Sequence, residues 1–178
     1  FSMPKRGIVK GEKIEEILKI ITGGKKIEDL DRKMAIVATD LNSAEEVVFD
    51  SGPIYKAIRA SISIPGFFEP VEYDGNLLVD GGVVDRVPIS VLKDMGADIV
   101  IAVDVGFSDY KNRVFHLLDI MQQSIDVMAK RILEGDKIYA DIILEPALSH
   151  IDSSQFERVE ECTEIGYNYT MEKMDEIL

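Results

Sequence analysis

The sequence predicts a single α/β domain, on three observations. Segments whose apolar residues recur at helical spacing alternate with short apolar runs that are typical of strands. Glycines and prolines separate these segments. The length of 178 residues suits one domain with a substantial core, and no linker or internal repeat divides it. We therefore expect residues 1–178 to form one domain, with a sheet that helices cover on both faces.

The first third of the chain predicts helix, strand, strand and helix in that order. Apolar residues recur at helical spacing over 12–21, and two glycines end the pattern. Residues 33–40 are typical of a buried strand that ends on an acid, and 45–49 of a short strand after it. Pro53 is a favourable residue in a first turn, so a helix is expected over 53–62.

The middle of the chain predicts a hairpin and a short helix. Residues 70–73 and 76–80 flank Asp74-Gly75, which is the strongest short signal for a two-residue hairpin turn. The helix is expected over about 88–95 and should end at the glycine that follows.

The C-terminal half predicts two strands and two long helices. The apolar runs at 99–103 and 142–144 are typical of strands that are buried on both faces. The longest helix is expected over about 114–134, ended by Gly135, and the last over about 157–177. The apolar stripe of the longest helix favours core packing over docking of a partner. It consists of Val114, Leu117, Leu118, Met121, Ile125, Met128 and Ile132.

Charge and composition exclude several classes of function. The formal net charge of −13 repels nucleic-acid phosphates, so no nucleic-acid partner is expected. It also repels anionic lipid headgroups, which leaves open only a transient membrane contact through apolar or local patches. The single cysteine, Cys162, excludes an intrachain disulfide and a CxxC metal site. We expect a cytoplasmic protein, with a peripheral position at the membrane and the oligomeric state left open.

Three acids end apolar strands and are candidates for a site: Asp40, Asp80 and Asp104. In an open α/β sheet, ligands bind beyond the carboxyl ends of the strands. An aspartate there also commonly caps a turn, and this role is favoured for Asp40 and Asp104. Two alternatives stay open: a metal-dependent phosphoryl hydrolase with the three acids around Mg²⁺, and a non-catalytic acidic binding module.

Asp80 differs from the other two acids because of its neighbours. Burial beside Leu78 and Val79 would raise its carboxyl pKa from about 3.9 by desolvation, toward the range in which it accepts a proton efficiently. Because glycine tolerates positive φ, Gly81 and Gly82 allow a sharp turn and a close approach of backbone or substrate. Asp80 is therefore the candidate general base, and the two glycines shape its turn.

The sequence around Asp80 resembles the patatin-like phospholipase family of the bacterial type. The resemblance is carried by ASISIPGFFEPV at 60–71, LVDGGV at 78–83, VPI at 87–89 and GADIVIAVDV at 96–105, with shorter segments at 7–11 and 38–41. It extends from near residue 7 to about 147. The fold that it implies is a three-layer α/β/α sandwich, incomplete here at the N-terminus.

The resemblance implies a serine hydrolase with a Ser–Asp dyad. In the family, a serine in a Gly-x-Ser-x-Gly elbow attacks an ester carbonyl, and the aspartate of the Asp-Gly-Gly turn, here Asp80, takes its proton. The N–H groups of a glycine-rich loop stabilise the oxyanion. The resemblance implies a lipid or other acyl ester as the substrate, and no metal or other cofactor.

The chain departs from the family pattern in two respects. No serine has glycines two residues away on both sides, and the glycine-rich loop is also missing; both would precede Phe1. We therefore expect the C-terminal portion of the domain, inactive by itself because the nucleophile is absent. In addition, Arg86 stands where many members of the family carry asparagine, so the hydrogen bonds near the turn are expected to differ.

Other polar and aromatic residues have simpler explanations. Ser61 and Ser63 favour capping of local backbone over catalysis. A Ser-His-Asp triad would need a histidine beside a nucleophile, and surface positions are favoured for both histidines, His116 and His150. The pair at 67–68 (Phe-Phe) is equally consistent with an acyl pocket and with core packing.

Overall fold

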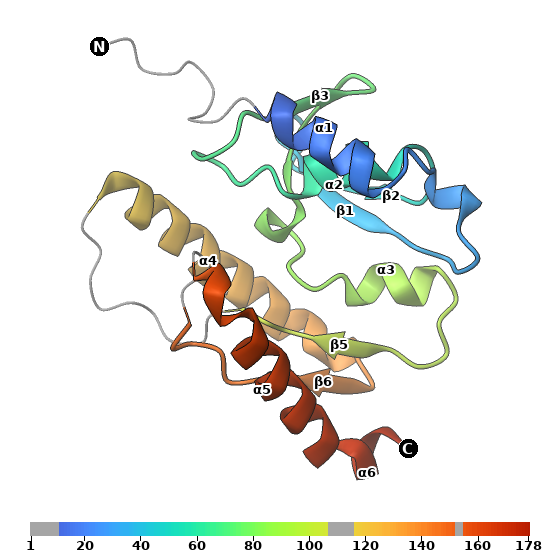
Figure 1. Cartoon of the computed structure of the whole chain (residues 1–178), viewed down its shortest axis with the longest axis vertical. Coiled ribbons are helices and arrows are strands. Elements are labelled where there is room, and N and C mark those ends of the chain that lie inside the picture. Colours follow the sequence, from blue (N-terminus) through green and yellow to red (C-terminus); the bar gives the residue numbers. More distant parts are fainter. Residues whose placement is uncertain (1–10, 107–115, 152–154) are drawn as a thin grey trace.

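The structure is a computed structural model and describes residues 11–106, 116–151 and 155–178, which form two sheets with helices around them (Figure 1). A four-stranded antiparallel sheet lies in the N-terminal half, in the order β2-β1-β4-β3. A two-stranded parallel sheet, β5-β6, lies in the C-terminal half. The predicted α/β class is confirmed. The single sheet covered on both faces is not, because the described strands divide between two separate sheets.

The strands of the larger sheet follow the predicted order along the chain. Their bounds are β1 (Ile36–Asp40), β2 (Glu46–Phe49), β3 (Val71–Tyr73) and β4 (Asn76–Asp80). The turn between β3 and β4 has Asp74 at φ 50° and Gly75 at φ 83°. Two successive positive φ angles are typical of a type I′ two-residue turn, so the predicted hairpin is confirmed.

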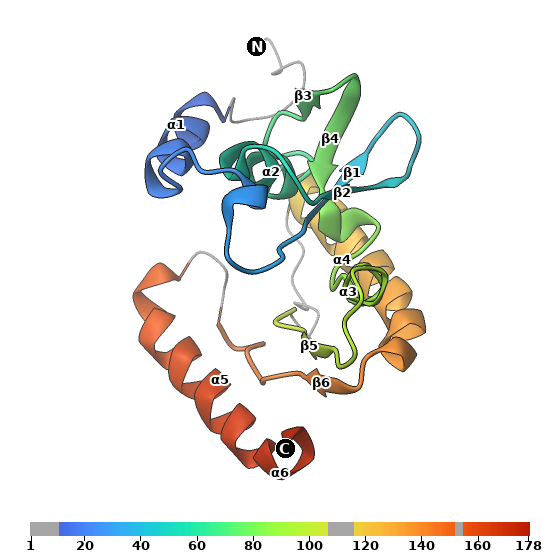
Figure 2. The same cartoon turned by 90° about the vertical axis from the view of Figure 1, so that its right-hand side faces the viewer.

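Two helices accompany this sheet, as predicted: α1 (Glu12–Ile21) and α2 (Ile54–Ser61). Helix α2 packs on β1 and β4, whereas α1 lies against α2 and has no buried residue. Figure 2 shows α2 between α1 and the strands. The first core therefore lies between α2 and the sheet. Its buried members are Ile27, Ala38, Phe49, Ile54, Ala57, Ala60 and Leu78.

The C-terminal half contains a second, smaller core. Its elements are α3 (Ile89–Asp94), β5 (Ile101–Val103), α4 (Leu117–Asp136), β6 (Ile142–Leu144), α5 (Val159–Glu172) and α6 (Met174–Ile177). The buried members of this core are Ile89, Val100, Ala102 and Leu133. The predicted helix over 157–177 is interrupted at Lys173, which separates α5 from α6, and neither of these helices has a buried residue.

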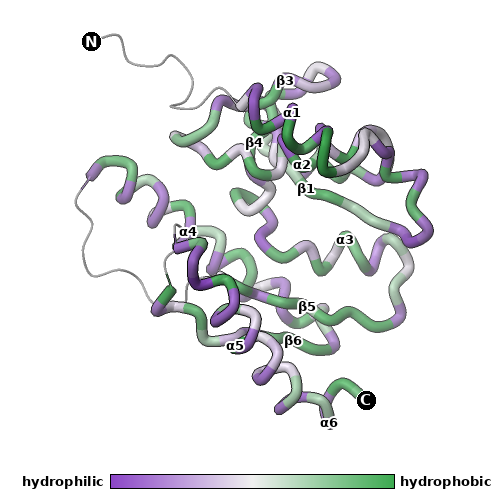
Figure 3. The backbone as a smooth tube through the Cα atoms, in the orientation of Figure 1, coloured by the Kyte–Doolittle hydropathy of each residue, from purple (hydrophilic) through white to green (hydrophobic). Residues whose placement is uncertain are grey.

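The structure corrects the burial that was predicted for β5. Ala102 is buried, but Ile101 and Val103 on the opposite face are 43% and 49% exposed. The strand is therefore buried on one face only, although Figure 3 shows it as hydrophobic along its length. A continuous apolar run identifies a strand, but burial also requires a covering layer on each face.

Helix α4 differs from its prediction in two ways. It continues through Gly135 to Asp136, and its buried residues are Ala129 and Leu133 rather than the predicted stripe. Four stripe residues are exposed, namely Leu117, Met121, Met128 and Ile132, whereas Val114 lies outside the described residues. The predicted core packing of this stripe is therefore wrong for those positions.

Within the described ranges, no helix is both long and apolar enough to cross a membrane.

Candidate functional site

The main chain of Asp80 is fixed by two neighbouring segments. Asp80 is the last residue of β4, and its N–H group donates a hydrogen bond of 3.1 Å to the carbonyl oxygen of Ser63, which follows α2. The hydroxyl group of Thr39 on β1 donates a bond of 2.9 Å to the carbonyl oxygen of Asp80. Thr39 and Ser63 are themselves buried. The sheet and the α2 loop therefore set the position of this residue.

The carboxyl group of Asp80 uses one oxygen to cap the next turn. Oδ1 accepts a hydrogen bond of 2.8 Å from the N–H group of Gly82, in the 3-10 turn η2 (Gly81–Val83). Oδ2 accepts no hydrogen bond within the part of the chain that the structure describes. Burial raises the pKa of Asp80, as its buried neighbours Leu78 and Val79 predict. The Gly82 hydrogen bond and the charge of Arg86 act against that rise.

Of the two glycines after Asp80, Gly81 is required because neighbouring backbone lies close to it, and not because its φ angle is unusual. Neither Gly81 nor Gly82 has a positive φ, so that part of the prediction is wrong. A Cβ atom on Gly81 would lie 2.5 Å from the carbonyl oxygen of Val37 on β1. Glycine is therefore needed because β1 passes directly beside the turn, which is the close backbone approach that the sequence predicted.

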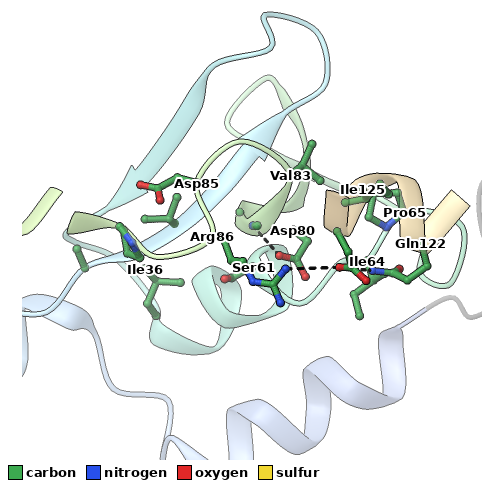
Figure 4. A pocket seen from close by; sticks show the side chains of 16 residues that line it. Ile36, Ser61, Ile64, Pro65, Asp80, Val83, Asp85, Arg86, Gln122 and Ile125 are labelled. Carbon is green, nitrogen blue, oxygen red and sulfur yellow. Dashed lines mark hydrogen bonds and ion pairs between the residues drawn. The ribbon is translucent and has the colours of Figure 1, made fainter. Parts of the chain in front are cut away.

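Asp80 lies in the wall of a cavity of about 450 Å³ (Figure 4). The wall combines apolar groups such as Ile64, Pro65 and Ile125 with a few polar ones, which is typical of a small-molecule site. The uncharged polar side chains in the cavity wall are those of Ser61 and Gln122. The charged residues of the wall are Asp80, Asp85, Arg86 and Asp126.

Asp40 does not join this site, because β1 and β4 are antiparallel and their carboxyl ends point in opposite directions. Its carboxylate instead accepts hydrogen bonds from the N–H groups of Leu77 (2.9 Å), Asn42 (3.3 Å) and Ser43 (3.2 Å). These bonds lower the pKa of Asp40, that of Leu77 having the largest effect. The favoured role of Asp40, capping a turn, is confirmed.

The metal alternative lacks the donor geometry that it needs. Asp104 accepts a hydrogen bond of 2.8 Å from the N–H group of Gly106 and pairs with Arg86 at 3.6 Å, so a cation already faces its carboxylate. Residues 11–106, 116–151 and 155–178 contain no group of three or more His, Cys, Asp or Glu side chains that could hold a metal ion. Asp40, Asp80 and Asp104 are therefore not gathered around a common point.

The remaining candidates mostly occupy structural positions. Ser63 is buried, and its hydroxyl group donates a hydrogen bond of 2.7 Å to the carbonyl oxygen of Arg59, which confirms the capping role. Phe67 is exposed and is not a core residue. Phe68 stacks near the Arg59 guanidinium group, 5.6 Å from its ring centroid. Neither phenylalanine lines the Asp80 cavity. The histidines at 116 and 150 are exposed, as predicted.

Sequence reasoning missed the contribution of α4 to the cavity. Gln122 and Asp126 line it from this helix, and the amide nitrogen of Gln122 donates a hydrogen bond of 3.4 Å to Asp126. Their spacing of four residues places them on one helix face, which the sequence could have shown. The sequence could not show that this face of α4 lies beside Asp80, because the two segments are about 40 residues apart in the chain.

A pair of carboxyl groups, Glu46 and Asp85, lies at the edge of the site. Glu46 on β2 has its pKa raised to about 7, first by burial and then by its hydrogen bond with Asp85 and the negative charge there. Burial also raises the pKa of Asp85, which lines the cavity. Oε1 of Glu46 is buried and has no hydrogen-bond partner among the described residues. The pair therefore favours one shared proton over two negative charges.

We expect this pair to make the protein less stable as the pH rises from about 4.5 to about 7. In that range folded Glu46 keeps a proton that the unfolded chain has released, so the free energy of unfolding falls. Glu46→Gln should remove this dependence and gain about 1 kcal/mol at pH 8, a value reduced for solvent screening. Urea unfolding at several pH values measures it. The exposed neighbour Glu45 supplies the control, Glu45→Gln, and equal slopes for wild type and Glu46→Gln would contradict the expectation.

The sequence that builds this site is similar to known proteins. A family model described as "Patatin-like phospholipase" matches residues 1–93, just over half of the chain. An uncharacterized NTE family protein of Mycobacterium tuberculosis is 43% identical over 108 residues, which cover 61% of this chain and 30% of that protein. The family model includes Asp80, Gly81 and Gly82, so the cavity wall is built largely from the matched segment.

Two further relatives match more of this chain at lower identity. Lysophospholipase NTE1 of Scheffersomyces stipitis is 29% identical over 84% of the chain, and patatin-like phospholipase domain-containing protein 7 of Rattus norvegicus is 28% identical over 82% of it. The chain spans 11% and 13% of the lengths of these two proteins. It thus corresponds to a limited part of each of these relatives.

Proposed function

This chain belongs to the patatin-like phospholipase family, and from that premise we propose that it is part of a lipid acyl hydrolase whose general base is Asp80. The nucleophilic serine would come from polypeptide outside these 178 residues, because no Gly-x-Ser-x-Gly elbow occurs among them. Residues 1–178 would then form the C-terminal portion of one patatin-like domain. By itself this portion should not turn over a substrate.

In the proposed reaction, Asp80 takes the proton of the serine hydroxyl group as its oxygen attacks the ester carbonyl. The attack forms a tetrahedral oxyanion, which collapses to an acyl-enzyme and releases the alcohol. Water then cleaves the acyl-enzyme and releases the fatty acid. Asp80 needs an oxygen that is free to accept the proton and a main chain that is fixed relative to the nucleophile.

The observation that carries the proposal is the placement of the Asp80 carboxyl group at the cavity wall. One oxygen is anchored by Gly82, while Oδ2 is left for a group that enters the cavity. Partial burial raises the carboxyl pKa, which makes Asp80 a stronger base than an exposed aspartate. The cavity wall is also apolar enough to accept part of an acyl chain.

We further propose a lipid or other acyl ester as the substrate, with no nucleic-acid partner. A lysophospholipid is the first one to test, because one relative is named a lysophospholipase. Transient contact with a membrane surface and a cytoplasmic location complete the proposal.

The test begins with the protein encoded by the complete reading frame that contains these residues. It should cleave a para-nitrophenyl acyl ester and a lysophospholipid, and a fluorophosphonate probe should label one serine. Mass spectrometry of the labelled peptide should place that serine outside the 178 residues. A protein that neither cleaves these esters nor reacts with the probe would support the non-catalytic binding module instead. Activity that requires Mg²⁺ and is lost in chelator would support the metal-dependent alternative.

A further inference from the structure

One cation lies in the wall of the Asp80 cavity. Among the described residues of this wall, Arg86 alone carries a positive charge, against the carboxyl groups of Asp80, Asp85 and Asp126. Figure 4 shows the side chains of Arg86 and Asp80 in the wall of the same cavity, and the ion pairs that Arg86 forms are with Asp104 and Asp126. The side chain of Arg86 is only 21% exposed. Its charge therefore acts in a partly dehydrated region, where water screens electrostatic interactions less than at an open surface.

Two distant segments hold the Arg86 side chain in place. Its Nε atom lies 3.6 Å from Oδ1 of Asp104, which follows β5, and its Nη1 atom lies 3.7 Å from Oδ1 of Asp126 on α4. Gly106 provides the room, since a Cβ atom there would lie 2.2 Å from Nη2 of Arg86. The guanidinium group is thus fixed between β5 and α4 while it borders the same cavity as Asp80.

We propose that Arg86 is a positioning residue for the reaction proposed above: Asp104 and Asp126 hold its guanidinium group in the cavity wall, where its positive charge orients the Asp80 carboxyl group as the proton acceptor. The inference rests on the proposed function, because it gives Asp80 the role of proton acceptor.

The other groups around Asp80 leave this task to Arg86. Asp85 from the turn after η2 and Asp126 from α4 line the same wall and are acids, and Asp126 raises the pKa of Asp80. Strand β1 and helix α2 contribute only uncharged residues to the wall. Besides the charge of Arg86, the hydrogen bond from the N–H group of Gly82 favours the ionised form of the Asp80 carboxyl group. Burial acts against it, and a protonated Asp80 cannot accept the proton of the serine.

A purely structural role for Arg86, as a link between η2, β5 and α4, predicts a different outcome. Loss of such a link would lower stability and reduce activity equally at every pH. Loss of a charge beside the base would reduce activity mainly at acidic pH, where Asp80 becomes protonated. A lysine at this position keeps the charge but not the planar two-sided contact, so it should restore the pH profile more than the stability.

The experiment measures kcat/KM for a para-nitrophenyl acyl ester against pH, in the protein from the complete reading frame. In Arg86→Gln, the acidic limb of the profile should move up by about one pH unit, so that kcat/KM falls by up to about tenfold on the acidic limb and changes much less on the plateau at higher pH. Arg86→Lys should stay close to wild type. Arg131→Gln is the matched control, because Arg131 on α4 is exposed and pairs only with Glu134 within the described chain.

The outcomes separate this inference from the proposed function. A wild-type protein without esterase activity overturns the proposed function, and this inference with it. An active wild type whose Arg86→Gln variant loses activity uniformly across the pH range overturns the inference alone. If Arg86→Gln does not fold, as judged by circular dichroism, Gly106→Ala decides, since the new methyl group displaces the guanidinium group without removing its charge. Its acidic limb should also move up, and an unchanged profile overturns the inference.

Discussion

Asp80→Asn should reduce kcat for an acyl ester by about a thousandfold or more, with little change in folding. Removal of a general base typically costs between a hundredfold and ten-thousandfold. The asparagine side chain has the same shape, so its oxygen can still accept the hydrogen bond from Gly82 that anchors Asp80. It cannot take a proton from the serine. Steady-state kinetics of the protein from the complete reading frame measure the loss, and thermal unfolding checks the fold.

Two control variants sharpen this test. Asp98→Asn makes the same chemical change at an exposed position outside the cavity and should leave the rate unchanged. Ser61→Ala removes the hydroxyl group that lines the cavity near Asp80 and should also leave it unchanged. If Ser61→Ala instead abolished both turnover and fluorophosphonate labelling, the nucleophile would lie within this chain. A rate for Asp80→Asn close to that of wild type would refute the assignment of the base.

Gly81→Ala should destabilise the protein by about 2–3 kcal/mol and impair turnover at the same time. The added methyl group would lie 2.5 Å from the carbonyl oxygen and 2.8 Å from the carbonyl carbon of Val37, which are main-chain atoms of β1. Since β1 lies inside the larger sheet, between β2 and β4, the strand cannot move away without loss of its ladder hydrogen bonds. The turn that carries Asp80 must therefore shift. Urea unfolding and ester cleavage measure the two effects.

Gly135→Ala is the matched control for this prediction. Gly135 lies in α4 with nothing within 4 Å of the position of its Cβ atom. Alanine should therefore stabilise the helix by up to about 1 kcal/mol. Gly82→Ala is intermediate, because its Cβ atom would lie 3.1 Å from Oδ1 of Asp80 and disturb the carboxyl group more than the fold. Wild-type stability in Gly81→Ala would mean that the turn and β1 separate easily, and that the close approach is not required.

Local sequence signals predicted most elements of this fold because short-range physics decides them. The helices at 12–21 and 53–62 and the Asp74-Gly75 hairpin depend on spacing and turn chemistry within a few residues, and the structure confirms them. Predictions of which apolar faces are covered by neighbouring elements were less successful. The stripe on α4 and the run in β5 both predict a place in a core, yet each leaves large apolar side chains exposed. Periodicity records which face is apolar, and only the neighbouring layers decide whether that face is covered.

In the candidate site too, the features set by neighbouring residues were predictable from the sequence, and those set by distant residues were not. The apolar strand before Asp80 and the glycines after it were sufficient to identify a partly buried carboxyl group on a tight turn. The reason for Gly81 could not be foreseen, because its constraint comes from Val37, more than 40 residues earlier in the chain. The sequence distinguishes Arg86 only as a departure from the pattern of the family, and it contains no signal that Asp126 lies at the site.

By itself, the sequence determined the family, the α/β class, the order of the elements and the one acid with a distinctive setting. These follow from contiguous motifs and short-range periodicity, which a linear chain displays directly. The tertiary structure alone decided that β1 and β4 run antiparallel, which separates Asp40 from Asp80, and that β5 and α4 bring Asp104 and Asp126 to Arg86. Strand direction and helix docking bring together residues far apart in the chain, so the electrostatic surroundings of a carboxyl group are a property of the folded molecule.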